Sequence, residues 1–150
     1  KFSECLSKLM LELAHLIVKD GEGATKFIEV TVKGAESYES AFTIGKSIAN
    51  SPLVKTAFAG EDPNWGRVVM AIGKAGEKIN QTKLSICFGE YLIATNGMVS
   101  KYYSEKKIAA YMKNDSLSLT VDLGLGKDEA TVWTCDLTHD YVSINADYRS

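Results

Sequence analysis

The apolar positions along the chain follow two periods, and each period predicts a different kind of element. Over residues 3–19 they recur every three or four positions, which predicts an amphipathic helix. Its apolar positions are Leu6, Leu9, Met10, Leu13, Leu16 and Ile17. Over residues 25–33 apolar and polar residues alternate, which predicts a strand whose buried face carries Ile28, Val30 and Val32.

The rest of the chain continues this mixture of helical and strand patterns. Further helices are expected over residues 37–50, 65–75 and 104–113, and further strands over residues 83–89, 91–95, 116–123 and 129–137. Residues 52–59 are apolar and short, so helix and strand both stay open there. The tail over 138–149 could be helix or strand, because it fits neither period cleanly. Residues 124–128 are expected to join the last two predicted strands as a hairpin.

This order of elements predicts a single unit over residues 1–150. Its fold class is α+β, a mixed β-sheet with packed helices, because strands and helices do not alternate regularly. The strand over 25–33 is followed by a helix, which could also start a parallel crossover. The α/β class is therefore the alternative.

Composition and charge exclude several classes of function. The chain has 150 residues, 45% hydrophobic and 24% charged, with a net charge of −2. This balance argues against a chain-wide nucleic-acid surface, which needs a basic excess. The longest apolar runs are far too short for a membrane span.

The cysteines and histidines give no sign of a metal site. Cys5, Cys87 and Cys135 are far apart and form no CxxC pair. His15 and His139 have no ligand spacing. We therefore expect no metal, and reduced cysteines fit a cytoplasmic protein.

A glutamate between two glycines is the first candidate for chemistry. Glu22 lies between Gly21 and Gly23, after the first predicted helix and before the first predicted strand. Glycine leaves room for close approach, so the carboxylate could be presented to a ligand; the alternative is a solvated turn. A phosphate-binding loop needs the opposite order of strand and helix, so nucleotide binding is not favoured.

Two other stretches concentrate polar side chains. In residues 60–67 the pattern predicts Asn64 as a helix cap, Trp65 as an anchor, and an ion pair between Asp62 and Arg67. The tail over 145–150 is dense in hydrogen-bonding side chains, although a frayed end is its simplest interpretation. No Ser-His-Asp or Cys-His set can be placed, and no GxSxG elbow is present.

Three segments together resemble one enzyme family. DGEGATKFIEVTVKGA (20–35), SPLVKTAFAGEDPNWGRVVMAIG (51–73) and WTCDLTHDYVSINADYRS (133–150) are similar, in order and spacing, to the bacterial ornithine acetyltransferases of arginine biosynthesis. The resemblance covers essentially the whole chain. It implies the layered α/β architecture of that self-processing family.

The resemblance also implies an activity. Family members cleave themselves before a threonine, which becomes the nucleophile. They move an acetyl group from N2-acetyl-L-ornithine to L-glutamate by a ping-pong mechanism, and some use acetyl-CoA as donor. The self-cleavage segment is not found in residues 1–150, so the chain is expected to be the C-terminal part of the β chain, without the nucleophile.

By the same resemblance, substrate binding is expected at Glu22, Asn145 and Ser150, with no catalytic residue, metal or cofactor in this chain. Ser150 stands where the family often has threonine. The expected partner is the α chain of the same precursor, in a heterotetramer of two α and two β chains, with no nucleic acid and no membrane. A non-catalytic assembly domain and a related self-processing amidohydrolase are the alternatives.

Overall fold

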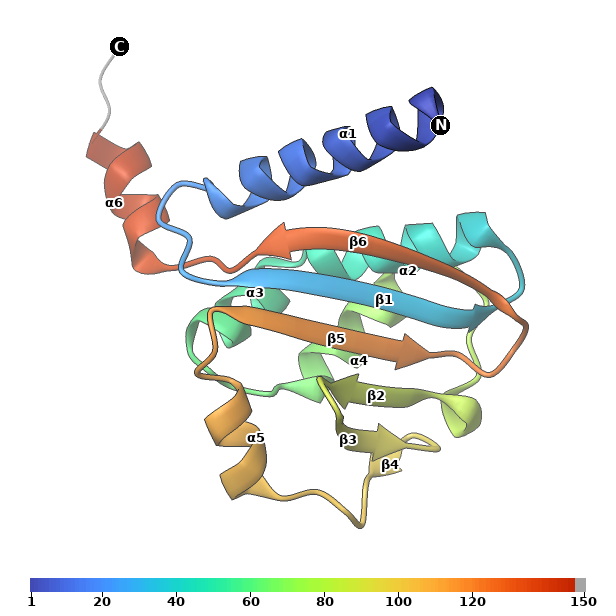
Figure 1. The fold of residues 1–150 in the computed structure, drawn as a ribbon. Coiled ribbons are helices and arrows are strands. Elements are labelled where there is room, and N and C mark those ends of the chain that lie inside the picture. Colours follow the sequence, from blue (N-terminus) through green and yellow to red (C-terminus); the bar gives the residue numbers. More distant parts are fainter. Residues whose placement is uncertain (148–150) are drawn as a thin grey trace.

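The computed structural model of the protein describes residues 1–147. They form helices, one short 3-10 helix and a single sheet (Figure 1). In chain order the elements are α1 (Phe2–Lys19), β1 (Phe27–Ala35), α2 (Tyr38–Ala49), α3 (Pro52–Ala59), α4 (Trp65–Lys74), η1 (Gln81–Lys83), β2 (Ser85–Phe88), β3 (Tyr91–Thr95), β4 (Met98–Val99), α5 (Glu105–Tyr111), β5 (Ser116–Asp122), β6 (Asp128–Cys135) and α6 (His139–Asp147). The mixed sheet with packed helices confirms the predicted fold class.

The sheet has six strands in the order β4-β3-β2-β5-β1-β6. Strands β1 and β5 are parallel, and the other neighbouring pairs are antiparallel. The predicted hairpin through residues 124–128 is wrong, because β1 lies between β5 and β6 and pairs with both. The two consecutive strands β5 and β6 are therefore separated by a strand from much earlier in the chain.

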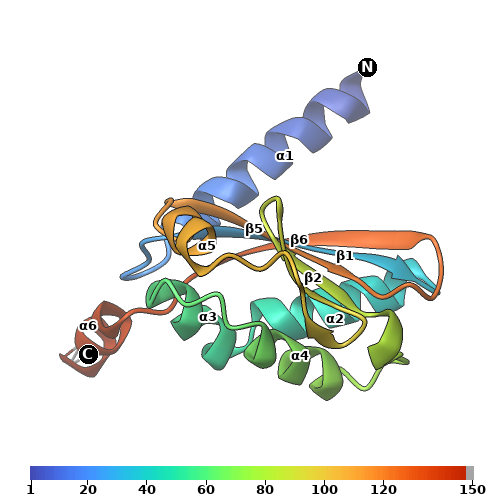
Figure 2. The same ribbon diagram turned by 90° about the horizontal axis from the view of Figure 1, so that it is seen from below.

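Helices α2, α3 and α4 cover one face of the sheet, as the view from below shows (Figure 2). Strand β1 turns Ile28, Val30 and Val32 toward them, and these side chains are at most 1% exposed, as its alternation predicts. Ile44 of α2 and Ile72 of α4 are fully buried on the helix side. The core therefore lies between the helices and this face of the sheet.

The caps of the covering helices follow the sequence. Ser37 accepts a hydrogen bond from Ser40 N at the start of α2, and Asn64 accepts one from Arg67 N at the start of α4. Residues 52–59, where both interpretations were open, form helix α3, with Pro52 at its first turn and Ser51 as cap. A proline fits there because the first helical amide needs no partner within the helix.

Helix α1 lies on the other face of the sheet, where it contacts the end of β6 (Figures 1 and 2). The His15 ring packs against Trp133 and Phe27, at centroid distances of 4.7 and 5.2 Å. No residue of α1 is buried, although its sequence is amphipathic. Its apolar side chains Leu9, Leu13 and others therefore face solvent in this chain.

Candidate functional site

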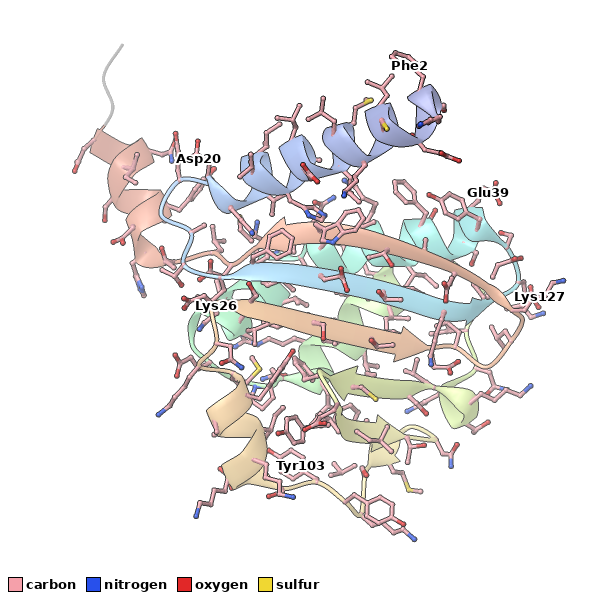
Figure 3. All side chains as sticks on the ribbon, viewed as in Figure 1. Phe2, Asp20, Lys26, Glu39, Tyr103 and Lys127 are labelled. Atoms are coloured by element: carbon pink, nitrogen blue, oxygen red, sulfur yellow. The ribbon has the colours of Figure 1, made fainter. Side chains whose placement is uncertain are left out.

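Three segments that are far apart in the sequence meet at one end of the sheet. Residues 20–26 lead into β1, residues 136–138 leave β6, and α6 follows them. Figure 3 shows Asp20 and Lys26 at this end and Lys127 at the opposite one. We call it the loop end. It carries both of the predicted binding residues that the structure describes.

The structure brings Glu22 and Asn145 into direct contact. Asn145 Nδ2 donates to Glu22 Oε2 at 2.6 Å and to Tyr141 O at 2.9 Å. Both side chains are exposed. Since the two residues lie 123 positions apart, this contact depends on the fold. Ser150, the third predicted residue, lies outside the described residues.

The contact fixes what this pair can offer a ligand. Both hydrogens of the Asn145 amide point to acceptors of the chain, so its Oδ1 is left to accept. A carboxylate is also an acceptor, and Glu22 retains its Oε1 for a ligand. The pair therefore suits a donor-rich cationic group such as an ammonium, through charge-assisted hydrogen bonds.

A buried carboxylate holds the end of the glycine loop. Asp136 is 3% exposed and accepts three hydrogen bonds. They come from Thr25 N at 2.8 Å, Lys26 N at 2.9 Å and Thr25 Oγ1 at 2.7 Å. A buried charge is tolerated where several donors surround it. Asp136 therefore fixes the backbone immediately after the loop that carries Glu22.

A buried lysine joins the same end of the sheet to the loop between α3 and α4. Lys26 is 7% exposed, and its Nζ lies 3.6 Å from Glu61 Oε1 and donates to Asn114 O at 3.4 Å. Glu61 has φ 56°, a left-handed conformation that is uncommon outside glycine. The Lys26 ammonium therefore links the segment before β1 to the loop between α3 and α4 and to the loop between α5 and β5.

The contacts of the 61–67 loop are those of a helix start. Asp62 accepts a hydrogen bond from Asn64 Nδ2 at 2.9 Å. Arg67 donates from Nη1 to Leu53 O at 2.9 Å and to Thr56 at 3.2 Å. The predicted ion pair of Asp62 with Arg67 is wrong, because the guanidinium turns to α3. The partly buried Trp65 packs against the core, as expected of an anchor.

Two hollows flank the loop end. One of about 390 Å³ lies between α3 and α6, with Thr56, Leu137 and Val142 in its lining. The other, about 300 Å³, lies at the starts of β1 and β5 and is lined in part by Lys26. Within residues 1–147, no group of three or more His, Cys, Asp or Glu is placed to hold a metal ion.

Sequence reasoning singled out Glu22 and Asn145 but missed the residues that support them. The side chains of Asp136, Lys26 and Glu61 make their polar contacts with segments distant in sequence, so no local pattern reveals them. The one available signal was Asp136 near the end of the strand predicted over 129–137, within a segment quoted for the resemblance.

The fold and the loop end together define a structural class of protein. The chain is a layered domain in which α2, α3 and α4 cover one face of a mixed sheet (Figure 2), and it presents an exposed acceptor pair at the sheet's end. Among the described residues, no helix combines the length and apolar character that crossing a membrane requires.

Comparison with known proteins identifies the family. The ArgJ family profile matches residues 1–150. The chain is 59% identical, over its whole length, to the arginine biosynthesis bifunctional proteins ArgJ of Ruegeria pomeroyi and of Zymomonas mobilis. The crystal structure of ArgJ from Bacillus halodurans matches 98% of this chain and 69% of that chain, with TM-score 0.94 and 41% identity. The chain belongs to the ArgJ family.

The family membership confirms the resemblance seen in the three segments. The chain spans 37% of the length of these two curated relatives. That share does not confirm the expected position at the C-terminal end of the β chain.

Proposed function

We propose that this chain supplies one wall of the substrate pocket of an acetyltransferase of arginine biosynthesis. The enzyme moves an acetyl group from N2-acetyl-L-ornithine to L-glutamate through an acetyl-threonine intermediate. The observation that carries the proposal is the contact of Glu22 with Asn145, which makes one acceptor site from two ends of the chain. The proposal assigns these residues to binding and places the nucleophilic threonine outside residues 1–150.

The chemistry of the pair suggests which group it binds. Ornithine and N2-acetylornithine carry a side-chain ammonium, whereas the side chain of glutamate ends in a carboxylate. An acceptor pair attracts the ammonium and repels the carboxylate. Glu22 and Asn145 therefore orient the acetyl donor by its side chain, which holds the acetyl group toward the nucleophile.

Steady-state kinetics of the complete, processed enzyme tests this role. Glu22→Gln removes the charge and keeps the shape, so we expect KM for N2-acetylornithine to rise about tenfold, as for loss of one charged hydrogen bond. KM for glutamate should change much less. Glu39→Gln is the matched control, because Glu39 is an exposed glutamate at the opposite end of the sheet (Figure 3). An unchanged KM in Glu22→Gln contradicts the binding role.

The same assay distinguishes the proposed acetyl transfer from hydrolysis and from transfer with another donor. Release of acetate that does not depend on glutamate would favour an amidohydrolase, in which water takes the acyl group. Transfer from acetyl-CoA in place of N2-acetylornithine would show a second donor. We assign no resident cofactor, and we place the reaction in the cytoplasm, in keeping with free Cys5, Cys87 and Cys135.

We further propose that α1 contacts the α chain of the same precursor, in a heterotetramer of two α and two β chains. Leu9, Leu13 and Leu16 are 51–60% exposed on α1, an apolar surface that is unusual on a helix left in solvent. The longer relatives supply the remaining protein that would cover it. Leu9→Asp with Leu13→Asp should abolish co-purification of the two chains, whereas Lys8→Asp on the same helix should not.

A further inference from the structure

The hydroxyl of Thr138 joins the two elements that carry the candidate site. Thr138 Oγ1 donates to Gly23 O at 2.6 Å, within the glycine loop. The same oxygen accepts from Asp140 N at 3.2 Å, in the first turn of α6. A hydroxyl has one hydrogen to donate, and Thr138 donates it to the glycine loop. A lone pair of the same oxygen then accepts from the first turn of α6 and caps that helix.

The loop and the helix also touch through their backbones. Gly23 has φ +66°, and a Cβ added to it would lie 2.7 Å from Tyr141 N and 2.8 Å from Asp140 Cβ. The loop therefore lies against the first turn of α6 with no room for a side chain. We expect a change in the Thr138 contact to shift Glu22 relative to Asn145, because these two residues are carried by the two elements in contact.

We propose that Thr138 is a positioning residue that sets the separation of Glu22 and Asn145. It acts through those two side chains and does not touch the substrate, so the inference rests on the proposed function. Loss of the hydroxyl frees the loop from the helix start and weakens the acceptor pair. Ground-state binding then weakens while the chemical step is left unchanged, so KM rises and kcat does not fall.

The test uses three variants of the complete, processed enzyme. Thr138→Val removes the hydroxyl at nearly constant shape, and Thr138→Ser retains it. Thr134→Val is the matched control, because Thr134 Oγ1 also donates to a distant backbone carbonyl, that of Ala49, at 3.1 Å on the helix-covered side. KM and kcat for N2-acetylornithine and the melting temperature are measured for each.

We expect Thr138→Val to raise KM about tenfold with kcat within about twofold, as for loss of one hydrogen bond that orders the site. Thr138→Ser should restore KM to within about twofold of the parent enzyme. Thr134→Val should lower the melting temperature and leave KM unchanged. An equal rise in KM in Thr134→Val would overturn the inference, since general loss of stability would then explain both.

A double-mutant cycle with Glu22→Ala decides whether Thr138 acts through Glu22. In the Glu22→Ala background, Thr138→Val should change KM by less than about twofold, because the group it positions is already gone. The same factor in both backgrounds would overturn the positioning role. If Glu22→Ala alone leaves KM unchanged, the proposed function fails; if it raises KM and Thr138→Val does not, this inference alone fails. Thr138→Ala replaces Thr138→Val if the valine variant does not fold.

Discussion

The helix-covered face of the sheet and its loop end are built from different interactions. On the covered face, side chains such as Phe58 and Ile44 are at most 2% exposed and meet other apolar groups. At the loop end, Glu22 and Asn145 are exposed and are placed by hydrogen bonds of defined direction. Apolar packing depends on area and volume, whereas a hydrogen bond depends on the position of two particular atoms.

This difference assigns separate tasks to the two regions. Burial of apolar area on the covered face stabilises the fold as a whole. At the loop end, hydrogen bonds instead fix the position of one segment relative to another. Substitutions in the core should therefore change stability more than affinity, and substitutions at the exposed positions of the loop end should do the reverse.

The largest effect on stability is expected in the core. Phe58 is 2% exposed and packs against Phe88 at a centroid distance of 5.7 Å. Phe58→Ala should reduce the free energy of unfolding by about 3–5 kcal/mol through lost burial and the cavity that remains. Urea denaturation measures this change. Phe42→Ala, at a position 41% exposed, is the control and should cost under about 1 kcal/mol.

The next effect is expected at Asp136, where the two regions adjoin. Asp136→Ala leaves the backbone amides of Thr25 and Lys26 without their acceptor, so we expect a loss of about 2–3 kcal/mol. Asp136→Asn should lose less, because its Oδ1 can still accept from both amides. Urea denaturation ranks the variants. An equal loss in Ala and Asn would show that the charge, rather than these hydrogen bonds, holds the loop.

A smaller loss of stability and a clear loss of affinity are expected at Gly23. Gly23→Ala places a Cβ against the start of α6 at φ +66°, a strain of about 1–2 kcal/mol that displaces the loop. KM for N2-acetylornithine should rise about tenfold, since 1.4 kcal/mol is a factor of ten. Gly73→Ala is the control: beyond its chain neighbours and the backbone of its own helix, nothing lies within 4 Å of the added Cβ, and the change should stabilise helix α4 slightly. A raised KM in Gly73→Ala would contradict this assignment.

The covered face was largely predictable from the sequence, because its pattern is local. The alternation over 25–33 located Ile28, Val30 and Val32 in the core, and the serine before 38–49 located the start of α2. Such signals depend on neighbours a few residues away. Strand pairing does not, so the sequence suggested a hairpin where β1 lies between two later strands.

The loop end was predictable only in part. Glu22 stood out as a glutamate between two glycines, but its substrate-binding role and that of Asn145 came from the family resemblance. Their hydrogen bond over 123 positions needed the fold. The local sequence predicted an ion pair of Arg67 with Asp62, and this prediction is wrong. The guanidinium of Arg67 donates to Leu53 O of α3 instead. The supporting role of Asp136 could not be predicted from hydrophobic periodicity, because a single side chain makes all of these hydrogen bonds and no repeated pattern is needed.

The smallest effect is expected at Cys87 in β2, which lies on the face of the sheet opposite to α2, α3 and α4 and belongs to neither region. Burial raises the pKa of the Cys87 thiol above its ordinary value of 9.0; Asp122 adds to the rise and Lys33 opposes it. The folded chain therefore favours the neutral thiol, and the unfolded chain ionises first as the pH increases. The stability that this group contributes is present below pH 9 and is lost as the pH rises through the folded-state pKa.

Urea denaturation between about pH 8 and pH 10 tests this assignment. The free energy of unfolding should fall with rising pH, and Cys87→Ala should reduce that slope. Cys5→Ala is the control, because Cys5 is exposed on α1 and should leave the slope unchanged. An identical slope in Cys87→Ala and the parent chain would mean that the Cys87 thiol is as well solvated in the folded chain as in the unfolded chain.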